Sequence, residues 1–182
     1  MNLFIPAILM VLSALMVRPG AIHAQETEAG AAARLSFGQI LRDERIDTLR
    51  AYLLMHNSPL AEASTHFVSE ADRLDLDWKL VAAIAGTEST FGKHVPTGSY
   101  NAWGWGIPTG AQSGIAFESW KQGITTVSEG LKYRYINRGA TSIEGIGRIY
   151  AASPRWAGNV RFFLAKIETF TPADPDLLAV TL

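Results

Sequence analysis

Residues 77–92 read DWKLVAAIAGTESTFG, and this stretch predicts both a buried helix and a candidate active site. Its apolar residues recur at helical spacing, and Gly92 is a suitable left-handed residue with which to end the helix. At about 100° per residue, Glu88 falls between Val81 and Ile84 on the apolar face. A carboxylate is rarely buried on such a face unless it is paired or functional.

Two effects are expected to raise the pKa of Glu88. Partial burial disfavours a charged carboxylate, and the negative end of the helix dipole repels it. A glutamic acid that keeps its proton near neutral pH can serve as a general acid. The pattern by itself also allows a Glu88 that pairs with Arg or Lys, or one that reaches solvent from the helix end.

The rest of the chain predicts a mostly α fold. Helical spacing or helix-start signals occur over about residues 36–57, 60–74, 120–137, 141–150 and 156–167. Ser58 followed by Pro59 is a helix-start signal, and Thr141 with Glu144 has the spacing of a capping box. Residues 93–116 are rich in glycine and aromatic residues without a sustained period, which predicts an irregular loop or small lobe. No strand pattern is present.

The ends of the chain predict an exported protein. Residues 3–17 form an apolar run that, at about 1.5 Å per residue, is too short to span a membrane. Small residues follow, so we expect a signal peptide that is cut after Ala24, with an uncleaved N-terminal anchor as the alternative. The expected organisation is a signal peptide over 1–24, a flexible leader over 25–35, one domain over 36–170 and an extended tail over 171–182.

Composition excludes several classes of function. The 182 residues suffice for one domain, and 16 basic against 17 acidic side chains leave a net charge of −1. A nucleic-acid binder would need a basic excess, so that class is excluded. The chain has no cysteine, and its four histidines lack metal-ligand spacing. We therefore expect a monomer with no disulfide, no metal and no other cofactor.

Four motifs occur in the order found in lysozyme-like peptidoglycan hydrolases. They are Glu88-Ser89 at the end of an Ala-rich helix, Asn101-Ala102-Trp103-Gly104, Phe117-x-x-Trp120, and Tyr150-Ala151-Ala152-Ser153-Pro154. Over about residues 58–168 the chain resembles most closely the glucosaminidase domains (endo-β-N-acetylglucosaminidase-like). It also resembles the lytic transglycosylases. The resemblance implies a lysozyme-like helical fold with one irregular Gly- and Trp-rich loop.

The resemblance also implies an exported enzyme that cleaves β-1,4 linkages of peptidoglycan glycan strands, and that is secreted, periplasmic or associated with the cell wall. Glu88 would be the catalytic acid, with Tyr150 lining the cleft beside it as a second catalytic residue. Contacts to the glycan are expected from Ser89, Tyr100, Asn101, Trp103, Gly104 and Trp105. Flat rings suit the C–H faces of sugars, but a Trp here could instead cap the core, and Asn101 could instead fix a turn.

The sequence between Glu88 and Glu118 contains no Asp or Glu. Most glycosidases use two carboxylates about 5–9 Å apart, so their absence here favours a single-acid mechanism in which the N-acetyl group of the substrate assists. A carboxylate that folds over the cleft from elsewhere is the alternative, and the candidates are Glu118, Glu129 and Glu144.

The chain departs from the family pattern at positions that bear on which bond is cut. Trp105-Gly106-Ile107 follows Gly104, Ser153 stands where the family has Asp, and Trp156 is near a position often held by Tyr. We expect an N-acetylglucosaminidase. A lytic transglycosylase or muramidase of the same fold is one alternative, and a non-catalytic glycan-binding cell-wall factor is the other.

Overall fold

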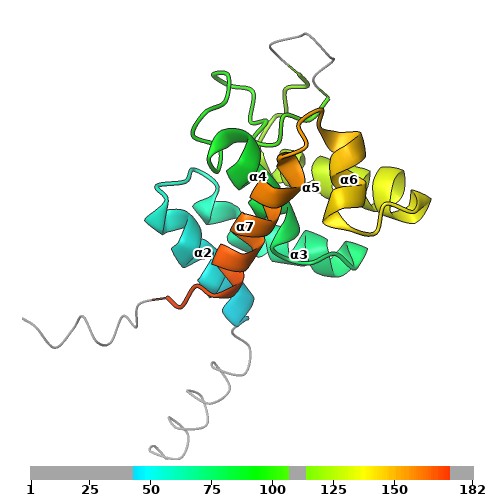
Figure 1. Ribbon diagram of the computed structural model, residues 1–182. Coiled ribbons are helices and arrows are strands. Elements are labelled where there is room, and N and C mark those ends of the chain that lie inside the picture. Colours follow the sequence, from blue (N-terminus) through cyan, green and yellow to red (C-terminus); the bar gives the residue numbers. More distant parts are fainter. Residues whose placement is uncertain (1–42, 107–113, 173–182) are drawn as a thin grey trace, which may run out of the picture. The chain divides into compact units, whose positions relative to one another are not determined.

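The computed structural model describes residues 43–106 and 114–172 of the chain (Figure 1). The predicted signal peptide, the leader, the start of the first predicted helix and most of the predicted tail lie outside the described residues. Residues 107–113 of the predicted irregular loop also lie outside them.

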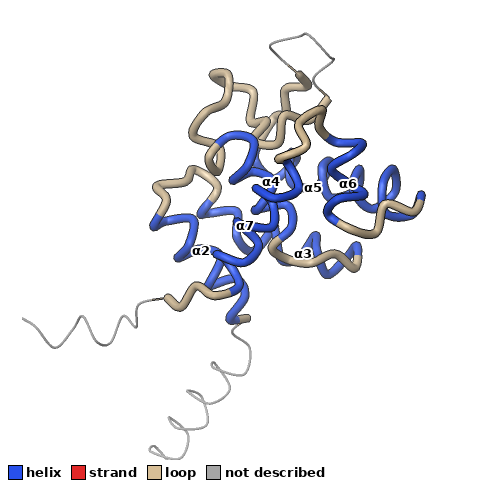
Figure 2. The backbone as a smooth tube through the Cα atoms, in the orientation of Figure 1, coloured by secondary structure: helices blue, strands red, loops and turns tan. Residues whose placement is uncertain are grey.

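Helices and loops make up the described chain, and no strand occurs in this part of it (Figure 2). The α-helices are α2 (Glu44–Met55), α3 (Ser64–Leu74), α4 (Leu80–Ser89), α5 (Trp120–Gly130), α6 (Ile143–Tyr150) and α7 (Trp156–Glu168). Shorter turns are η1 (Ala61–Ala63), η2 (Leu131–Tyr135) and η3 (Ile136–Arg138), of which η2 is a π-helical turn. The prediction of a mostly α fold is confirmed for the described residues.

Helix α4 is the most deeply buried helix of the core. Every residue from Leu80 to Ala85 is at most 4% exposed, so this helix is apolar on all sides. It packs chiefly against α7, which runs beside it in Figure 1. The expectation of one apolar face on this helix is therefore wrong. The environment of α4 changes along its length, from the core at its start to the surface at its last turn.

Trp103 fills the space between α4 and the α3–α5 pair. Its side chain is fully buried, and its Nε1 donates a hydrogen bond to the Val81 carbonyl at 2.9 Å. The ring packs against Phe67 and Phe117. Gly123 in α5 makes room for it, because a Cβ at that position would lie 2.5 Å from the indole. The indole therefore packs directly against the backbone of α5.

The helix predicted after Ser58 begins later than its start signal indicates. Ser58 Oγ accepts the Leu60 N–H at 3.1 Å and donates to the Phe91 carbonyl at 2.8 Å. The chain then forms η1, and α-helical geometry starts only at Ser64. Ser58 therefore fixes a turn against the end of α4 and does not cap α3.

The capping box predicted at the start of α6 is displaced by one residue. Ser142, and not Thr141, is the N-cap, and its Oγ accepts the Gly145 N–H at 3.0 Å. Glu144 is consequently free of the capping role and pairs with Arg161 of α7.

Helix α4 ends at Ser89, earlier than the predicted stop at Gly92. Thr90, Phe91 and Gly92 have φ values of 53°, 60° and 80°, which cost a non-glycine residue about 1–2 kcal/mol each. Ser89 Oγ holds this turn, since it accepts the Gly92 N–H at 2.8 Å and donates to the Ala102 carbonyl at 2.7 Å. The buried Phe91 ring packs against rings from α2 and α7. The turn therefore fixes where Glu88 points.

Candidate active site

Glu88 lies in the last turn of α4, where the buried helix reaches the surface. The residue as a whole is exposed, while burial of its carboxyl group still raises its pKa, as the expected partial burial requires. Its Oε1 accepts a hydrogen bond of 2.6 Å from Nε1 of Trp156, a residue that is only 3% exposed. One carboxyl oxygen is thus held by the protein, while the side chain remains accessible from solvent.

Two opposing contributions determine the pKa of Glu88. Burial raises this pKa, and the hydrogen bond from Trp156 lowers it by stabilising the carboxylate, with a net shift upward. An exposed side chain and a poorly hydrated carboxyl group are compatible when rings cover one side of the group and leave the other open. Two aromatic residues lie near the group: Trp156 donates its N–H to it, and the Trp156 ring stacks on Tyr150 at 4.8 Å with an interplanar angle of 26°.

Tyr150 connects Glu88 to the loop that follows α4. It is the last residue of α6 and is half-buried. Its hydroxyl donates a hydrogen bond of 2.7 Å to the Trp103 carbonyl. Burial raises the pKa of Tyr150 well above its ordinary value, and the nearby negative charge of Glu88 raises it further. The two predicted catalytic residues are therefore close enough to interact.

Gly104 and Trp105, two of the predicted glycan contacts, lie beside Tyr150. Both line a cavity of about 280 Å³ that Tyr150 also lines. Trp105 packs against Tyr150 and Tyr135, with ring centroids 5.7 and 6.0 Å apart. Trp105 is itself only 8% exposed, so it is a buried ring with one side at the cavity wall, and its contact to a glycan stays a prediction.

Three of the predicted glycan contacts are instead buried and engaged in the loop itself. Ser89, Asn101 and Trp103 are 4%, 7% and 0% exposed. The Ser89 hydroxyl holds the end of α4, as described above. Trp103 is the tryptophan that caps the core, which is the alternative considered from the sequence.

Asn101 fixes a turn. Its Nδ2 donates to the carbonyls of Trp105 at 2.9 Å and Ile115 at 2.8 Å, and its Oδ1 accepts the Trp105 N–H at 2.9 Å. With both ends of its amide engaged, Asn101 positions Trp105 beside Tyr150 and has no direct contact to offer a ligand.

Tyr100 is not brought together with the other site residues. Its side chain is 38% exposed and packs edge-on against Trp120 at 5.1 Å. It is not among the residues that line the cavity beside Tyr150. The structure therefore separates Tyr100 from the group formed by Gly104, Trp105 and Tyr150.

The three acidic residues considered as a second carboxylate have other surroundings. Glu129 accepts a hydrogen bond of 2.9 Å from Arg73 of α3, and Glu144 pairs with Arg161 of α7. Glu118 is exposed in the segment before α5. The shift in the Glu88 pKa has burial and Trp156 as its causes, and none of these acids contributes to it.

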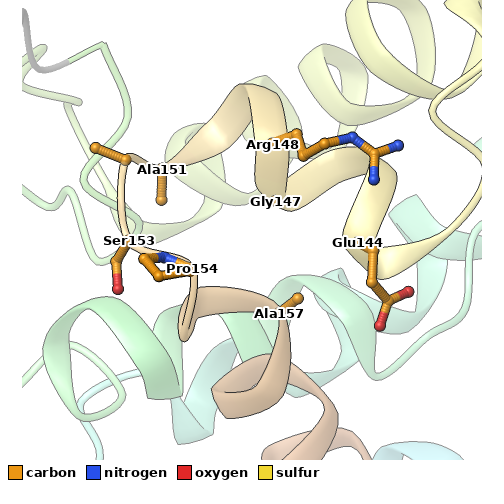
Figure 3. Close-up of a pocket in the computed structure, with 8 residues that line it drawn as sticks. Glu144, Gly147, Arg148, Ala151, Ser153, Pro154 and Ala157 are labelled. Atoms are coloured by element: carbon orange, nitrogen blue, oxygen red, sulfur yellow. The ribbon is translucent and has the colours of Figure 1, made fainter.

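A larger cavity of about 450 Å³ lies between α6 and α7 (Figure 3). Figure 3 shows Glu144 and Arg148 at one end of it and the loop residues Ser153 and Pro154 at the other. The motif segment 151–154 thus lines this space. The Trp156 ring lies against its wall, since a Cβ at Gly147 would be 2.9 Å from that ring.

Sequence reasoning missed the role of Trp156 and overlooked Arg134 and Tyr135. Trp156 was recognised only as a departure from the family pattern, although a tryptophan at a tyrosine position keeps a polar N–H to donate. Arg134 and Tyr135 line the 280 Å³ cavity from η2. The signal that could have found them is the run Lys132-Tyr133-Arg134-Tyr135, where basic and aromatic residues alternate.

Within residues 43–106 and 114–172, no three His, Cys, Asp or Glu side chains come together to hold a metal ion. No helix in the same ranges is long and apolar enough to cross a membrane. No protein-family model matches the chain, and the search of curated proteins found no match either.

Proposed function

We propose that the protein is an exported glycosidase of lysozyme-like fold that cleaves β-1,4 linkages in the glycan strands of peptidoglycan, with Glu88 as general acid. The observation that carries the proposal is the environment of Glu88, which is exposed, has a raised pKa and receives a hydrogen bond from a buried indole. A general acid needs access to the leaving oxygen and a proton near neutral pH. The order of the four sequence motifs supports the same function.

The Trp156 N–H determines which oxygen of Glu88 carries the proton. Oε1 accepts this N–H, and the unprotonated oxygen of a carboxylic acid is the better acceptor, so the proton belongs on Oε2. Oε2–H protonates the glycosidic oxygen while the bond from C1 to that oxygen breaks, and the bonding electrons leave with the departing sugar. Trp156 then stabilises the carboxylate that forms.

The positive charge that develops at C1 needs a nucleophilic group to stabilise it. In an enzyme with a single catalytic acid, the substrate supplies this group in place of a second carboxylate. The carbonyl oxygen of the N-acetyl group attacks C1 and forms a cyclic intermediate. Tyr150 donates its own proton to the Trp103 carbonyl, so toward a substrate its hydroxyl can accept the acetamido N–H. Water then attacks C1 and returns a proton to Glu88. Attack by the sugar's own 6-hydroxyl would give an anhydro product instead.

Digestion of purified cell wall by the protein and its Glu88→Gln variant tests the proposal. The wild-type protein should release soluble fragments, and the variant should lose about 10²–10⁴-fold in rate because it has no proton to give. Binding of the variant to cell wall, measured by sedimentation, should be retained. Glu44→Gln, an exposed position at the start of α2, is the matched control and should leave the rate unchanged.

Mass spectrometry of the fragments identifies the bond that is cut. Fragments that end in reducing N-acetylglucosamine support the N-acetylglucosaminidase assignment. Reducing muramic ends or anhydro sugars would replace it with a muramidase or a lytic transglycosylase. Near wild-type activity in Glu88→Gln would move the acid elsewhere. A wild-type protein that sediments with cell wall but releases nothing would support a glycan-binding factor.

A further inference from the structure

Three aromatic rings form the walls of the 280 Å³ cavity beside Tyr150. The ring centroids of Trp105, Tyr135 and Tyr150 are separated by 5.7, 6.0 and 6.1 Å. Trp105 is held in place from behind by Gly130 of α5, because a Cβ there would lie 2.2 Å from its ring. Flat rings suit the C–H face of a sugar, and the cavity also presents polar groups to a ligand.

Arg134 adds a positive charge to the lining of this cavity. It lies on the π-helical turn η2, a geometry frequently found at functional sites, and its side chain is exposed. Burial raises the pKa of Tyr135, and the charge of Arg134 lowers it, which places this charge close to the wall of the cavity.

No carboxylate among the described residues compensates this charge. Arg45, Arg73 and Arg161 each form a salt bridge with Asp or Glu, whereas Arg134 forms no salt bridge or hydrogen bond with any residue in 43–106 or 114–172. The described residues that line the cavity include no acid. The guanidinium is therefore available to a ligand, and its planar shape suits a carboxylate that it can bind with two parallel hydrogen bonds.

We propose that this cavity is a subsite for a sugar that carries a carboxylate, in which the rings hold the sugar and Arg134 binds the carboxylate. The inference rests on the proposed function and names the part of the glycan that is recognised. A strand whose alternate sugars bear a carboxylate, either directly as a lactyl ether or on an attached peptide, is preferred over a neutral polymer of N-acetylglucosamine.

Binding measured by isothermal titration calorimetry in the Glu88→Gln protein tests the subsite without turnover. The probes are neutral N-acetylglucosamine tetramer, peptide-free glycan with free lactyl carboxylates, and glycan with peptide stems. Arg134→Gln should weaken binding of a carboxylate-bearing glycan about tenfold and leave the neutral tetramer within about twofold. The affinity of Arg134→Lys for a carboxylate-bearing glycan should lie between those of Arg134→Gln and the parent protein, because lysine keeps the charge but not the paired donors. Arg138→Gln, an exposed cation in η3 that does not line the cavity, is the control.

The probes distinguish the two sources of the carboxylate. A loss confined to the peptide-free glycan assigns the lactyl carboxylate, and a loss confined to the stem-bearing glycan assigns the peptide. An Arg134→Gln protein that binds every probe as its parent does, or that loses affinity for all three equally, overturns the subsite. Digestion by the wild-type protein is scored separately, so that a failure of the subsite and a failure of the proposed function can be told apart.

Discussion

At the scale of single residues, the Glu88 carboxyl group and the Trp156 indole act as one unit. Burial of the carboxyl group raises its pKa, and the indole N–H lowers the same pKa by stabilising the charged form. The balance between these two effects sets the highest pH at which the acid still holds its proton. Trp156 acts through Glu88 and is therefore a positioning residue.

A Trp156→Phe variant removes the contribution that lowers the Glu88 pKa and keeps an aromatic ring in place. The pKa of Glu88 should rise further, so the alkaline limb of the profile of kcat/KM against pH should move to higher pH. The maximal rate should fall about tenfold or more, because the carboxylate that forms in the reaction loses a hydrogen bond. A pH–rate profile on soluble glycan measures both effects.

Trp78→Phe is the matched control for that profile, since Trp78 lies before the opposite end of α4. The alkaline limb of the pH–rate profile of Trp78→Phe should coincide with that of the wild-type protein. An alkaline limb in Trp156→Phe that stays in place or moves to lower pH would show that the indole does not control the acid.

At the scale of the elements, close approach between helices and the loop after α4 positions the site. The backbones of α5 at Gly123 and Gly130 contact Trp103 and Trp105 directly, where no side chain would fit. These two glycines lie seven residues apart, so they fall on the same side of α5. Helix α5 therefore supports both tryptophans through its glycine-bearing face.

Gly130→Ala tests this close approach. The new Cβ would lie 2.2 Å from Trp105, so the ring must move. We expect the free energy of unfolding to fall by about 1–3 kcal/mol and glycan binding to weaken, as measured by urea unfolding and calorimetry. A Cβ at Gly158 in α7 would have no heavy atom within 4 Å other than those of its chain neighbours and its own helix backbone. Gly158→Ala should therefore stabilise the protein by up to about 1 kcal/mol. Equal effects of the two substitutions would contradict this packing.

At the scale of the whole molecule, resistance to acid depends on a partly buried carboxylate. Glu70 is 8% exposed and accepts a hydrogen bond of 2.6 Å from Arg73, which also binds Glu129 of α5. The hydrogen bond from Arg73 lowers the pKa of Glu70. A group whose pKa is lowered by folding stabilises the fold above its unfolded pKa, and this stabilisation is lost as the pH falls through its folded pKa.

Arg73→Met should therefore destabilise the fold at neutral pH, because it leaves the Glu70 charge without its partner. The difference from the wild-type protein should shrink as the pH falls through the lowered pKa of Glu70 in the folded wild-type protein. Urea unfolding at about pH 7 and about pH 3 measures it. Arg50→Met breaks an exposed pair with Glu62 and should change stability by less than about 1 kcal/mol. A loss in Arg73→Met that is equal at both pH values would contradict this account.

The helices could be predicted from the sequence because their periodicity reflects burial, which neighbouring residues share. Periodicity failed for the surroundings of Glu88 because α4 is buried on every side until its last turn. The group that faces Glu88 there, Trp156, is 68 residues away along the chain. A helical wheel of α4 contains no information about which residue of another helix contacts Glu88.

The two tryptophans of the loop motif, both predicted as glycan contacts, have different environments in the structure. Trp103 and Trp105 are two residues apart, yet the first is enclosed in the core and the second lines a cavity. Their environments depend on Gly123 and Gly130 of α5, whose contacts are long-range. Residue type and spacing select both tryptophans as candidates, and the packing of α5 determines which of them lines a cavity.

Direct titration of the Glu88 side chain tests the central claim, namely that this group holds its proton above the usual pH range of a glutamic acid. The carboxyl carbon can be followed by ¹³C NMR across pH in the wild-type protein and in Trp156→Phe. We predict a pKa above the ordinary value of 4.5 in the wild-type protein, and a still higher pKa in the variant. A wild-type pKa at or below 4.5 would contradict the assignment of Glu88 as the general acid.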